Sequence, residues 1–332
     1  MDPKSNPTTA FQQLDPNHLL DAMDAAGWAT DGRVSALNSY ENRVYQVGLE
    51  DGSAVVAKFY RPERWTDAAI LEEHSFTQEL ADCDLPVIYP LAGSQGSTLQ
   101  TSGMFRFTVF TKAGGRPPEL DNPDQLEVIG RTLGRLHLVG EQAQFKDRVT
   151  LNPVRLGDES LHFLLDSDLL PMESKSIYES VARDILQQVH KAFAETRCTP
   201  LRIHGDFHPG NILWGRDDTP HLLDFDDTCT GPAVQDLWMF ISGDREYSTA
   251  RLADILEGYT QFREFDPAEL ALIEPLRSLR LLHYAAWIAR RWDDPAFKLA
   301  FPFFAERRFW DDHILSLREQ RAMLDEPALI WD

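Results

Sequence analysis

The chain has 332 residues, 43% of them hydrophobic and 26% charged, which suits a soluble globular protein large enough for two domains. A formal net charge of −21 opposes non-specific binding to nucleic acid or to an anionic membrane. No apolar run approaches the ~20 residues of a membrane span.

The N-terminus and the cysteines indicate a cytoplasmic chain. Residues 1–6 lack the apolar core of a signal peptide. The cysteines are three, with no C-x-x-C spacing, so we expect reduced thiols. We expect no nucleic-acid or membrane partner and a monomeric protein, although the sequence leaves the oligomeric state open.

The first part of the chain predicts a β-rich lobe with two helices. Asp15 can cap a helix that starts at Pro16, and Thr66 can cap a second helix with Ile70, Phe76 and Leu80 on its apolar side. Five antiparallel strands are expected, at residues 33–38, 43–49, 54–60, 87–92 and 104–110. This pattern is typical of a compact nucleotide-binding lobe.

The loop at residues 38–42 stands where a nucleotide-covering loop would lie, yet it contains no glycine. Glycines in such a loop let backbone amides approach phosphate without interference from side chains. Ser39 would have to substitute, through its hydroxyl or its amide. A plain polar hairpin tip explains the segment equally well.

Lys58 ends the strand Val55-Val56-Ala57-Lys58, which is similar to the V-A-I-K strand of kinases. In that strand the lysine holds the α- and β-phosphates of ATP. A glutamate on the next helix should hold the lysine extended. Glu73 is favoured because Phe76 and Leu80 follow on the same side, and Glu72 remains open; the other glutamate would be ordinary surface charge.

A change of composition at residues 111–118 predicts a hinge. We therefore expect an N-terminal nucleotide-binding lobe at 1–112 and a C-terminal catalytic and acceptor-binding lobe at 113–332. Two long amphipathic helices should open the second lobe, with stripes at Leu126, Ile129, Leu133 and Leu136 and at Ile177, Val181, Ile185 and Val189. His137 reads as a packed helix histidine.

The segment His204-Gly205-Asp206-Phe207-His208-Pro209-Gly210-Asn211 carries the D-x-x-x-x-N spacing of a kinase catalytic loop. Asp224 follows thirteen residues after Asn211, where a metal-holding aspartate is expected. Asp206 can orient an acceptor hydroxyl and take its proton. Asn211 and Asp224 offer the oxygen ligands that Mg²⁺ prefers. The pattern predicts transfer of a phosphoryl group from ATP.

The region after Asp224 is short and lacks an A-P-E motif, so switching by activation-loop phosphorylation is not expected. Asp226 and Asp227 would suit a cationic acceptor. A capped helix opens at Asp266 and is expected to be interrupted by Pro275. Four arginines in its continuation could contact an acidic acceptor, although a solvated face is the more ordinary explanation for each: Arg277, Arg280, Arg290 and Arg291.

With these motifs in view, the sequence resembles the aminoglycoside phosphotransferase and choline kinase superfamily, from Leu37 to about Trp310. Within it, the sequence looks like the bacterial stress response kinase A family. The segments that carry this likeness are Leu37 to Tyr45, Lys58 to Trp65, Gly231 to Trp238 and Arg290-Arg291-Trp292.

The resemblance implies an α+β, bilobal protein-kinase-like fold and an ATP-dependent, non-specific Ser/Thr protein kinase of the cytoplasm, linked to envelope and oxidative stress and able to phosphorylate itself. It implies that Asp206 is the proton acceptor, that Asn211 and Asp224 bind Mg²⁺, and that Ser39 and Lys58 contact ATP, while Asp236 braces the catalytic loop. Asp226 replaces the glycine of the kinase D-F-G motif, which puts the in-and-out switch of regulated kinases in doubt.

Three functions remain open at this point. The first is a protein kinase acting on a Ser or Thr hydroxyl, and the second is a small-molecule kinase acting on an amino alcohol, a sugar or an aminoglycoside. The third, a dead nucleotide-binding scaffold, is disfavoured because Lys58, Asp206, Asn211 and Asp224 are all present. We also expect a Lys58→Ala variant to fold normally and to lose turnover by orders of magnitude.

Overall fold

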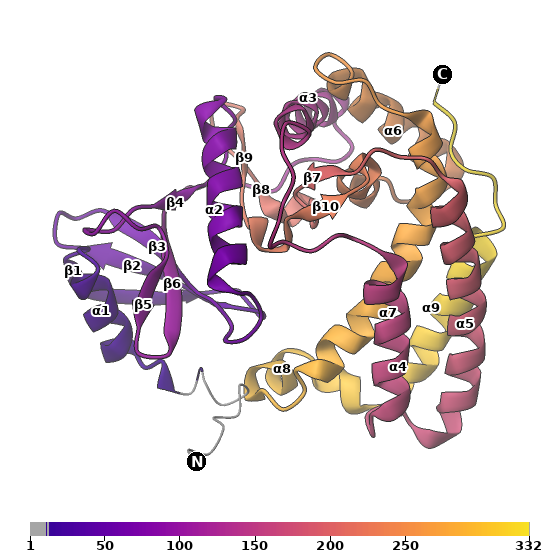
Figure 1. The fold of residues 1–332 in the computed structure, drawn as a ribbon, viewed down its shortest axis with the longest axis horizontal. Helices are drawn as coiled ribbons and strands as arrows, with labels where there is room; N and C mark the ends of the chain where they lie inside the picture. The colour runs from indigo at the N-terminus through magenta and orange to yellow at the C-terminus, as the bar shows by residue number, and fades with distance from the viewer. Residues whose placement is uncertain (1–10, 12, 332) are drawn as a thin grey trace. The chain divides into compact units, whose positions relative to one another are not determined.

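The computed structural model describes Phe11 and residues 13–331, which form two compact units (Figure 1). Unit 1 contains the chain up to Glu119 together with Phe145–Arg148 and Pro209–Thr228. Unit 2 contains Leu120–Gln144, Val149–His208 and Cys229 onward. The two-lobe division at 112/113 stays a prediction, since these units follow spatial contacts and take up segments from several parts of the chain.

Unit 1 is built on an antiparallel sheet whose strands run in the order β1-β2-β3-β6-β4, with β5 paired to β6. The sheet has six strands where the sequence predicts five. The additional strand, β5, is three polar residues long and has no apolar alternation to reveal it. The strands are β1 (Thr30–Leu37), β2 (Arg43–Leu49), β3 (Ala54–Phe59), β4 (Pro90–Leu91), β5 (Gln100–Ser102) and β6 (Phe105–Thr111).

Two helices pack against this sheet. Asp15 caps α1 (Pro16–Ala25), and Thr66 caps α2 (Asp67–Asp82), each by accepting a backbone N–H with its side chain. Alternation along β3 places Ala57 and Phe59 in the apolar core shared with α1 and leaves Lys58 on the opposite face. That face meets α2, so one strand divides unit 1 into an apolar side and a charged side.

A second, two-stranded sheet belongs to unit 1. It pairs β8 (Ile212–Trp214) with β9 (Pro220–Leu222). Backbone hydrogen bonds tie it to the rest of the unit, from Ile88 N–H to Leu222 C=O (2.8 Å) and between Arg116 and Trp214. The short helical turns η3 (Pro209–Asn211) and η4 (Phe225–Asp227) lie at its open end.

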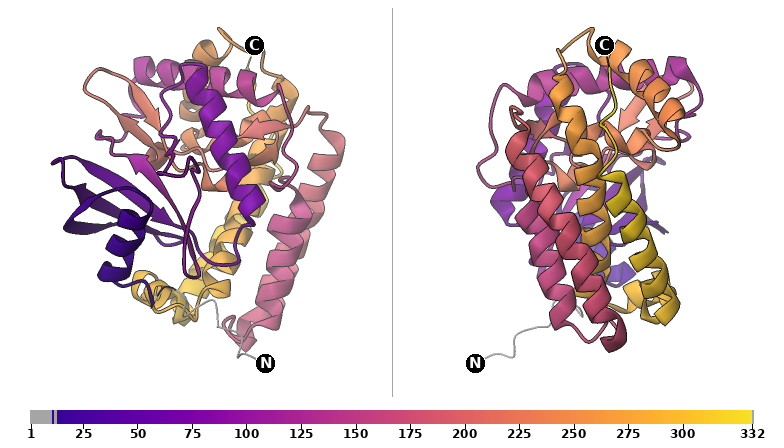
Figure 2. Two further views of the ribbon diagram at one scale, coloured as in Figure 1. Left: turned by 60° about the vertical axis from the view of Figure 1, so that its left-hand side comes forward. Right: turned by 90° about the vertical axis from the view of Figure 1, so that its right-hand side faces the viewer.

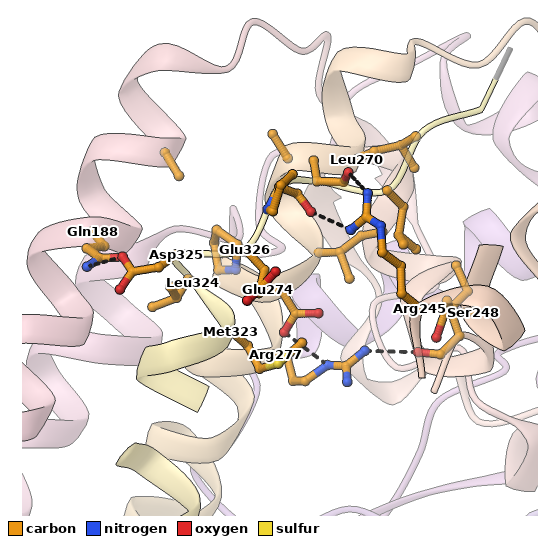
Figure 3. A pocket seen from close by; sticks show the side chains of 18 of the residues that line it. Gln188, Arg245, Ser248, Leu270, Glu274, Arg277, Met323, Leu324, Asp325 and Glu326 are labelled. Atoms are coloured by element: carbon orange, nitrogen blue, oxygen red, sulfur yellow. Dashed lines mark hydrogen bonds and ion pairs between the residues drawn. The ribbon is translucent and has the colours of Figure 1, made fainter. Parts of the chain in front are cut away.

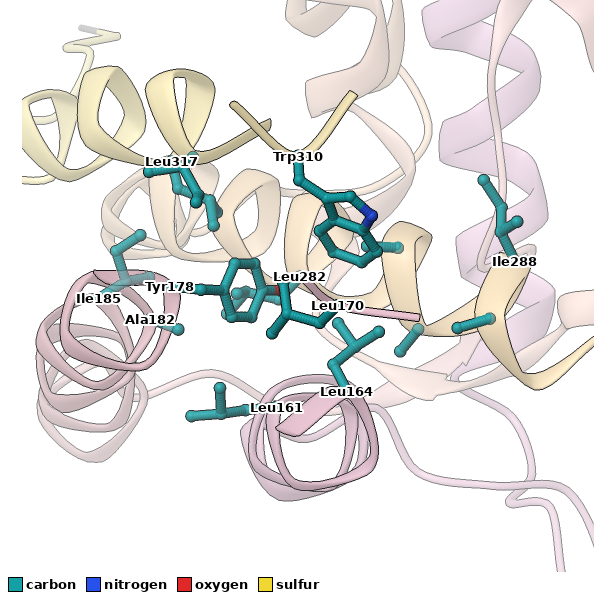
Figure 4. Close-up of a cluster of buried hydrophobic side chains, with 14 of the residues drawn as sticks. Leu161, Leu164, Leu170, Tyr178, Ala182, Ile185, Leu282, Ile288, Trp310 and Leu317 are labelled. Carbon is teal, nitrogen blue, oxygen red and sulfur yellow. The ribbon is translucent and has the colours of Figure 1, made fainter. Parts of the chain in front are cut away.

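Unit 2 is mainly helical. Helices α4, α5, α7 and α9 enclose a continuous core that includes Leu164, Tyr178, Leu282 and Trp310 (Figure 4). Helices α5, α7 and α9 lie side by side (Figure 2). The helices are α3 (Pro123–Gly140), α4 (Glu159–Asp166), α5 (Met172–Glu195), α6 (Arg245–Tyr259), α7 (Ile273–Arg290), α8 (Pro295–Ala300) and α9 (Arg307–Met323).

Helix α3 packs against α6 so closely that backbone atoms of the two helices are in contact. A Cβ at Gly130 would lie 1.9 Å from the carbonyl oxygen of Ile255, so only glycine permits this approach. The pair of strands β7 (Leu201–Ile203) and β10 (Cys229–Gly231) completes the unit. Strand β7 leads directly into the His204-Gly205-Asp206 segment, so the position of the strand sets the position of Asp206.

Two predictions about unit 2 helices are wrong in detail. Ile177 is 46% exposed, because the buried side of α5 runs through Tyr178, Ala182 and Ile185. Pro275 interrupts nothing, since α7 begins at Ile273 and proline is tolerated in a first turn, where its missing N–H has no partner to lose. Among the described helices, none is both long enough and apolar enough to cross a membrane.

Candidate active site

Lys58 lies at the centre of a buried group of carboxylates in unit 1. Its Nζ is 2.9 Å from Asp226 Oδ1, 3.2 Å from Asp224 Oδ1 and 3.7 Å from Glu73 Oε1. Burial disfavours the ammonium charge, but the three carboxylates raise the pKa of Lys58 well above its usual range. The lysine is therefore held charged and extended.

Two arginines balance the surplus negative charge of this group. Arg64 pairs with both Asp226 and Asp227, and Arg148 lies 3.8 Å from Glu73 and donates to the backbone carbonyls of Asp226 and Thr228. Burial raises the pKa of Glu73 to about 7, although the charge of Lys58 opposes this. For Asp226, the nearby Arg64 and Lys58 outweigh burial and lower the pKa below its usual range.

Glu72 is more than the surface charge that the sequence suggests for one of the two glutamates. Its carboxylate accepts the backbone N–H groups of Lys146, Asp147 and Arg148 at 2.7, 2.8 and 2.9 Å. These bonds fix the segment that delivers Arg148 to Glu73. Neighbouring positions on α2 thus have different roles. Glu73 lies beside Lys58, and Glu72 binds the segment that carries Arg148.

Asn211 and Asp224 flank the open end of the β8–β9 hairpin in unit 1. The N–H of Leu223 donates to the carbonyl of Asn211 at 3.1 Å, so the hairpin register places the two residues next to each other in the backbone. Asp224 adopts a left-handed backbone (φ 61°, ψ 62°), which is costly for a residue with a Cβ and clusters at functional sites. Half of its side chain is exposed.

This donor set fits a hard cation that retains other ligands. An amide oxygen and a half-exposed carboxylate are ligands of the type that Mg²⁺ takes together with phosphate oxygens and water. Within the described part of the chain, no group of three His, Cys, Asp or Glu side chains could hold a metal by itself. Asn211 and Asp224 would leave further coordination positions of such an ion to phosphate oxygens and water.

Ser39 lies in the loop between β1 and β2, where its hydroxyl donates to the carbonyl of Asn42 at 3.0 Å. Asn42 in turn is buried, donating its amide to Asp226 and accepting from the N–H of Arg61. The loop is thus tied to the Lys58 group through Asn42. A role for Ser39 in binding ATP stays a prediction.

Asp206 belongs to unit 2, in the loop that follows β7. Its Oδ1 is 2.7 Å from Arg280 Nη1 on α7, and its Oδ2 is 3.5 Å from His208 Nε2. Burial would raise the pKa of Asp206, but the contacts with His208 and Arg280 outweigh it and hold the pKa below its usual range. The carboxylate is thus kept ionised, as a proton acceptor must be.

Asp236 braces this loop, as the resemblance implies. Its fully buried carboxylate accepts the N–H of His204 at 2.7 Å and that of Gly205 at 2.8 Å. Gly205 has φ 86°, a conformation that glycine adopts without strain. His137 contacts the same carboxylate and the hydroxyl of Tyr259, and burial lowers its pKa, so it is a packed neutral histidine as predicted.

The sequence interpretation missed three contributors to the site. The sequence suggests that Asp226 suits a cationic acceptor. In the structure Asp226 is 3% exposed, and among the three carboxylates it lies closest to Lys58. Its signal was the aspartate in place of the D-F-G glycine. Arg64 and Arg148 gave no recognisable signal, because their contacts join segments more than 70 residues apart.

A pocket of about 560 Å³ in unit 2 is lined by Arg277, one of the four arginines offered as acceptor contacts, and by none of the predicted catalytic, nucleotide-binding or metal-binding residues (Figure 3). Its two arginines are occupied within the protein. Arg245 donates to the carbonyls of Pro327 and Ala328, and Arg277 donates to Ile241 and lies 3.6 Å from Glu274. The pocket is therefore separate from the chemistry inferred for Asp206.

Comparison with known proteins identifies the family and the fold of the chain. The model of the phosphotransferase enzyme family matches residues 33–273. Among solved structures, amicoumacin kinase hAmiN in complex with AMP-PNP, Ca²⁺ and Ami superposes with a TM-score of 0.75, at 21% identity over 96% of each chain. A microcompartment-associated aminopropanol kinase superposes with a TM-score of 0.71, at 17% identity over 94% of this chain and 97% of that one.

The antiparallel unit 1 and the helical unit 2 are thus confirmed as an α+β fold of the protein-kinase-like type, and the chain is a phosphotransferase. Stress response kinase A of Escherichia coli is 43% identical over 98% of both chains. A Salmonella typhimurium relative, serine/threonine protein kinase RdoA, is 42% identical over 96% of both. The chain therefore belongs to the phosphotransferase enzyme family and, within it, to the stress response kinase A group.

Proposed function

We propose that this phosphotransferase is a cytoplasmic Ser/Thr protein kinase of the stress response that uses ATP and Mg²⁺ and phosphorylates itself as well as protein acceptors. The observation that carries the proposal is 43% identity to stress response kinase A across 98% of both chains. The name of the Salmonella relative specifies serine/threonine protein kinase. The match covers 98% of this chain, so it extends over the segments around Lys58 and around Asp206.

Unit 1 would provide the nucleotide side of the reaction. Lys58, held by Glu73 and Asp226, would neutralise phosphate oxygens. Asn211 and Asp224 would hold Mg²⁺, which when bound neutralises charge on the phosphates. Ser39 would contact ATP from the loop between β1 and β2. In this proposal the aspartate at 226 keeps the lysine oriented before nucleotide arrives.

Unit 2 would provide the acceptor side. Asp206 orients the acceptor hydroxyl and takes its proton, while Asp236 holds the loop by two backbone hydrogen bonds. The lowered pKa of Asp206 keeps it ionised at neutral pH, ready for that proton. This division gives each unit one task, charge neutralisation in unit 1 and proton acceptance in unit 2.

A small-molecule kinase is the alternative, because both superposed structures are named as kinases of small molecules, amicoumacin and aminopropanol. At 21% and 17% identity these structures define the fold alone. The sequence argument for a cationic acceptor also weakens, since Asp226 and Asp227 are already paired with Arg64. Protein phosphorylation is therefore the better-supported proposal.

Labelled ATP with Mg²⁺ separates the two. The protein is incubated alone, then with myelin basic protein, and then with a panel of amino alcohols, sugars and aminoglycosides. We expect label on serine or threonine of protein, absent with Asp206→Asn. Label found only on small molecules would contradict the protein kinase proposal while leaving the phosphotransferase class intact.

A further inference from the structure

Arg280 is the residue of unit 2 that makes the closest charged contact with the predicted proton acceptor. It lies on α7, more than 70 residues from Asp206 in the chain, and its Nη1 donates to Asp206 Oδ1 at 2.7 Å. Half of its side chain is exposed, compared with about a quarter of that of Asp206. The arginine therefore stands on the solvent side of the carboxylate rather than beneath it.

The two oxygens of Asp206 have different surroundings. Oδ1 is engaged by Arg280 in a charge-assisted hydrogen bond of ordinary length. Oδ2 lies 3.5 Å from His208 Nε2, and His208 together with Arg280 lowers the pKa of Asp206. Backbone contacts complete the setting, since the N–H of Asp206 faces His204 Nδ1 at 3.4 Å. Of these two charged contacts, the one with Arg280 is the shorter.

We propose that Arg280 is a positioning and specificity residue of the acceptor site: it holds the Asp206 carboxylate in place through Oδ1, and it favours acceptor segments that carry acidic side chains beside the hydroxyl. The inference rests on the proposed function. In the step itself, the acceptor oxygen bonds to the γ-phosphorus, the bond from that phosphorus to the bridging oxygen of ADP breaks, and the hydroxyl proton moves to the Asp206 carboxylate.

The selectivity follows from charge. An isolated aspartate beside an acceptor hydroxyl attracts cationic acceptors, whereas the Arg280–Asp206 pair has no net charge and exposes the guanidinium. An acidic side chain next to the acceptor hydroxyl can pair with the exposed part of the arginine, and a lysine there is repelled. Arg280 thus gives this acidic protein a positive group at the place where its acceptor is expected.

Two measurements test the inference. The first is the pH dependence of slow ATP hydrolysis without acceptor, in which water replaces the hydroxyl. Removing the arginine in Arg280→Gln should raise the acidic limb of kcat/KM by about 1–3 pH units, since a nearby opposite charge shifts a carboxyl pKa by that amount. Arg280→Lys should restore much of the shift. Arg290→Gln is the matched control, because Arg290 is also exposed on α7 but contacts the carbonyl of Glu159.

The second measurement uses synthetic peptides with one serine flanked by aspartate, by glutamine or by lysine. We expect the unmodified protein to favour the aspartate peptide over the lysine peptide by about tenfold in kcat/KM, as one favourable charge contact provides. Arg280→Glu should reverse this order, and Arg290→Gln should keep it.

The outcomes are distinguishable. If no peptide is labelled while the acidic limb of hydrolysis shifts, the protein kinase proposal and the peptide selectivity both fail, and the positioning of Asp206 stands. If the limb stays in place in Arg280→Gln, or moves equally in Arg290→Gln, the positioning role is overturned. Unchanged peptide order in Arg280→Glu overturns the specificity role.

Discussion

The charged groups of the two units differ in how deeply they are buried. In unit 1, Lys58, Glu73 and Asp226 are each at most 5% exposed and are linked to one another and to two arginines. In unit 2, Asp206 and Arg280 form a pair that solvent reaches. A buried network resists change because each member neutralises another, whereas an exposed pair can be altered at little cost in stability. Substitutions in the buried network of unit 1 should therefore affect both stability and activity, whereas substitutions in the exposed pair of unit 2 should affect activity alone.

The largest effect is expected in unit 2 and on activity alone. Asp206→Asn keeps the shape of the side chain but removes the proton acceptor, so turnover should fall by about 10²–10⁴-fold. The melting temperature and nucleotide affinity should change little, because the Lys58 group is untouched. Steady-state kinetics, thermal melting and titration with an ATP analogue measure the three quantities. A large fall in melting temperature would show that Asp206 is a structural residue instead.

Lys58→Met should affect both quantities. The variant leaves Glu73 and Asp226 buried with less positive charge around them, at a cost of about 3–5 kcal/mol in the free energy of unfolding. The expectation that loss of Lys58 leaves folding unchanged is thus revised by the burial of its partners. Urea denaturation and kinase assays on the same preparation measure the result. Full stability in Lys58→Met would mean that Arg64 and Arg148 suffice to neutralise the carboxylates.

Glu72→Gln should cost about 1.5–3 kcal/mol, since a neutral amide replaces a carboxylate that accepts three backbone N–H groups. The loss should also loosen Arg148, so hydrogen exchange at residues 145–148 should quicken. Asp82→Asn at the exposed end of the same helix is the control and should leave both readouts nearly unchanged. Equal effects of the two substitutions would remove Glu72 from the support of the Lys58 group.

The smallest effect concerns pH. His313 in the core of unit 2 stacks on Phe309, and burial lowers its pKa to about 4. The unfolded chain binds a proton near pH 6.5 and the folded chain does not, so stability falls as pH drops below about 6.5. Between pH 7 and pH 5.5 the loss should be about 1 kcal/mol for this group. His313→Phe keeps the stacking and should remove that part of the pH dependence, measured by urea melts at both values.

Much of the fold is readable from local sequence. The caps Asp15, Thr66 and Asn122 mark helix starts because a short polar side chain satisfies free N–H groups there. The polar strand β5 and the buried side of α5 were not predicted correctly, since both depend on tertiary neighbours. Ile177 has the hydrophobicity of a core residue, but the geometry of α5 gives that place to Tyr178.

The candidate site divides in the same way. Spacing singled out Asp206, Asn211 and Asp224, and likeness to the V-A-I-K strand singled out Lys58; their roles stay predictions. The partners Arg64, Arg148 and Arg280 come from distant segments, and an arginine in an exposed sequence context gives no indication of which carboxylate it will meet. Long-range charge pairing is therefore the part of this site that only the three-dimensional arrangement supplies.

The left-handed backbone at Asp224 also has an evolutionary consequence. Glycine would relax that conformation, so Asp224→Gly should recover backbone strain, but it also removes the ion pair with Lys58 and a carboxylate that the proposed chemistry needs. Selection for thermal stability alone would not detect the loss of that carboxylate's chemistry. Directed evolution of this protein for stability must therefore measure turnover in every round, so that stable but inactive variants are discarded.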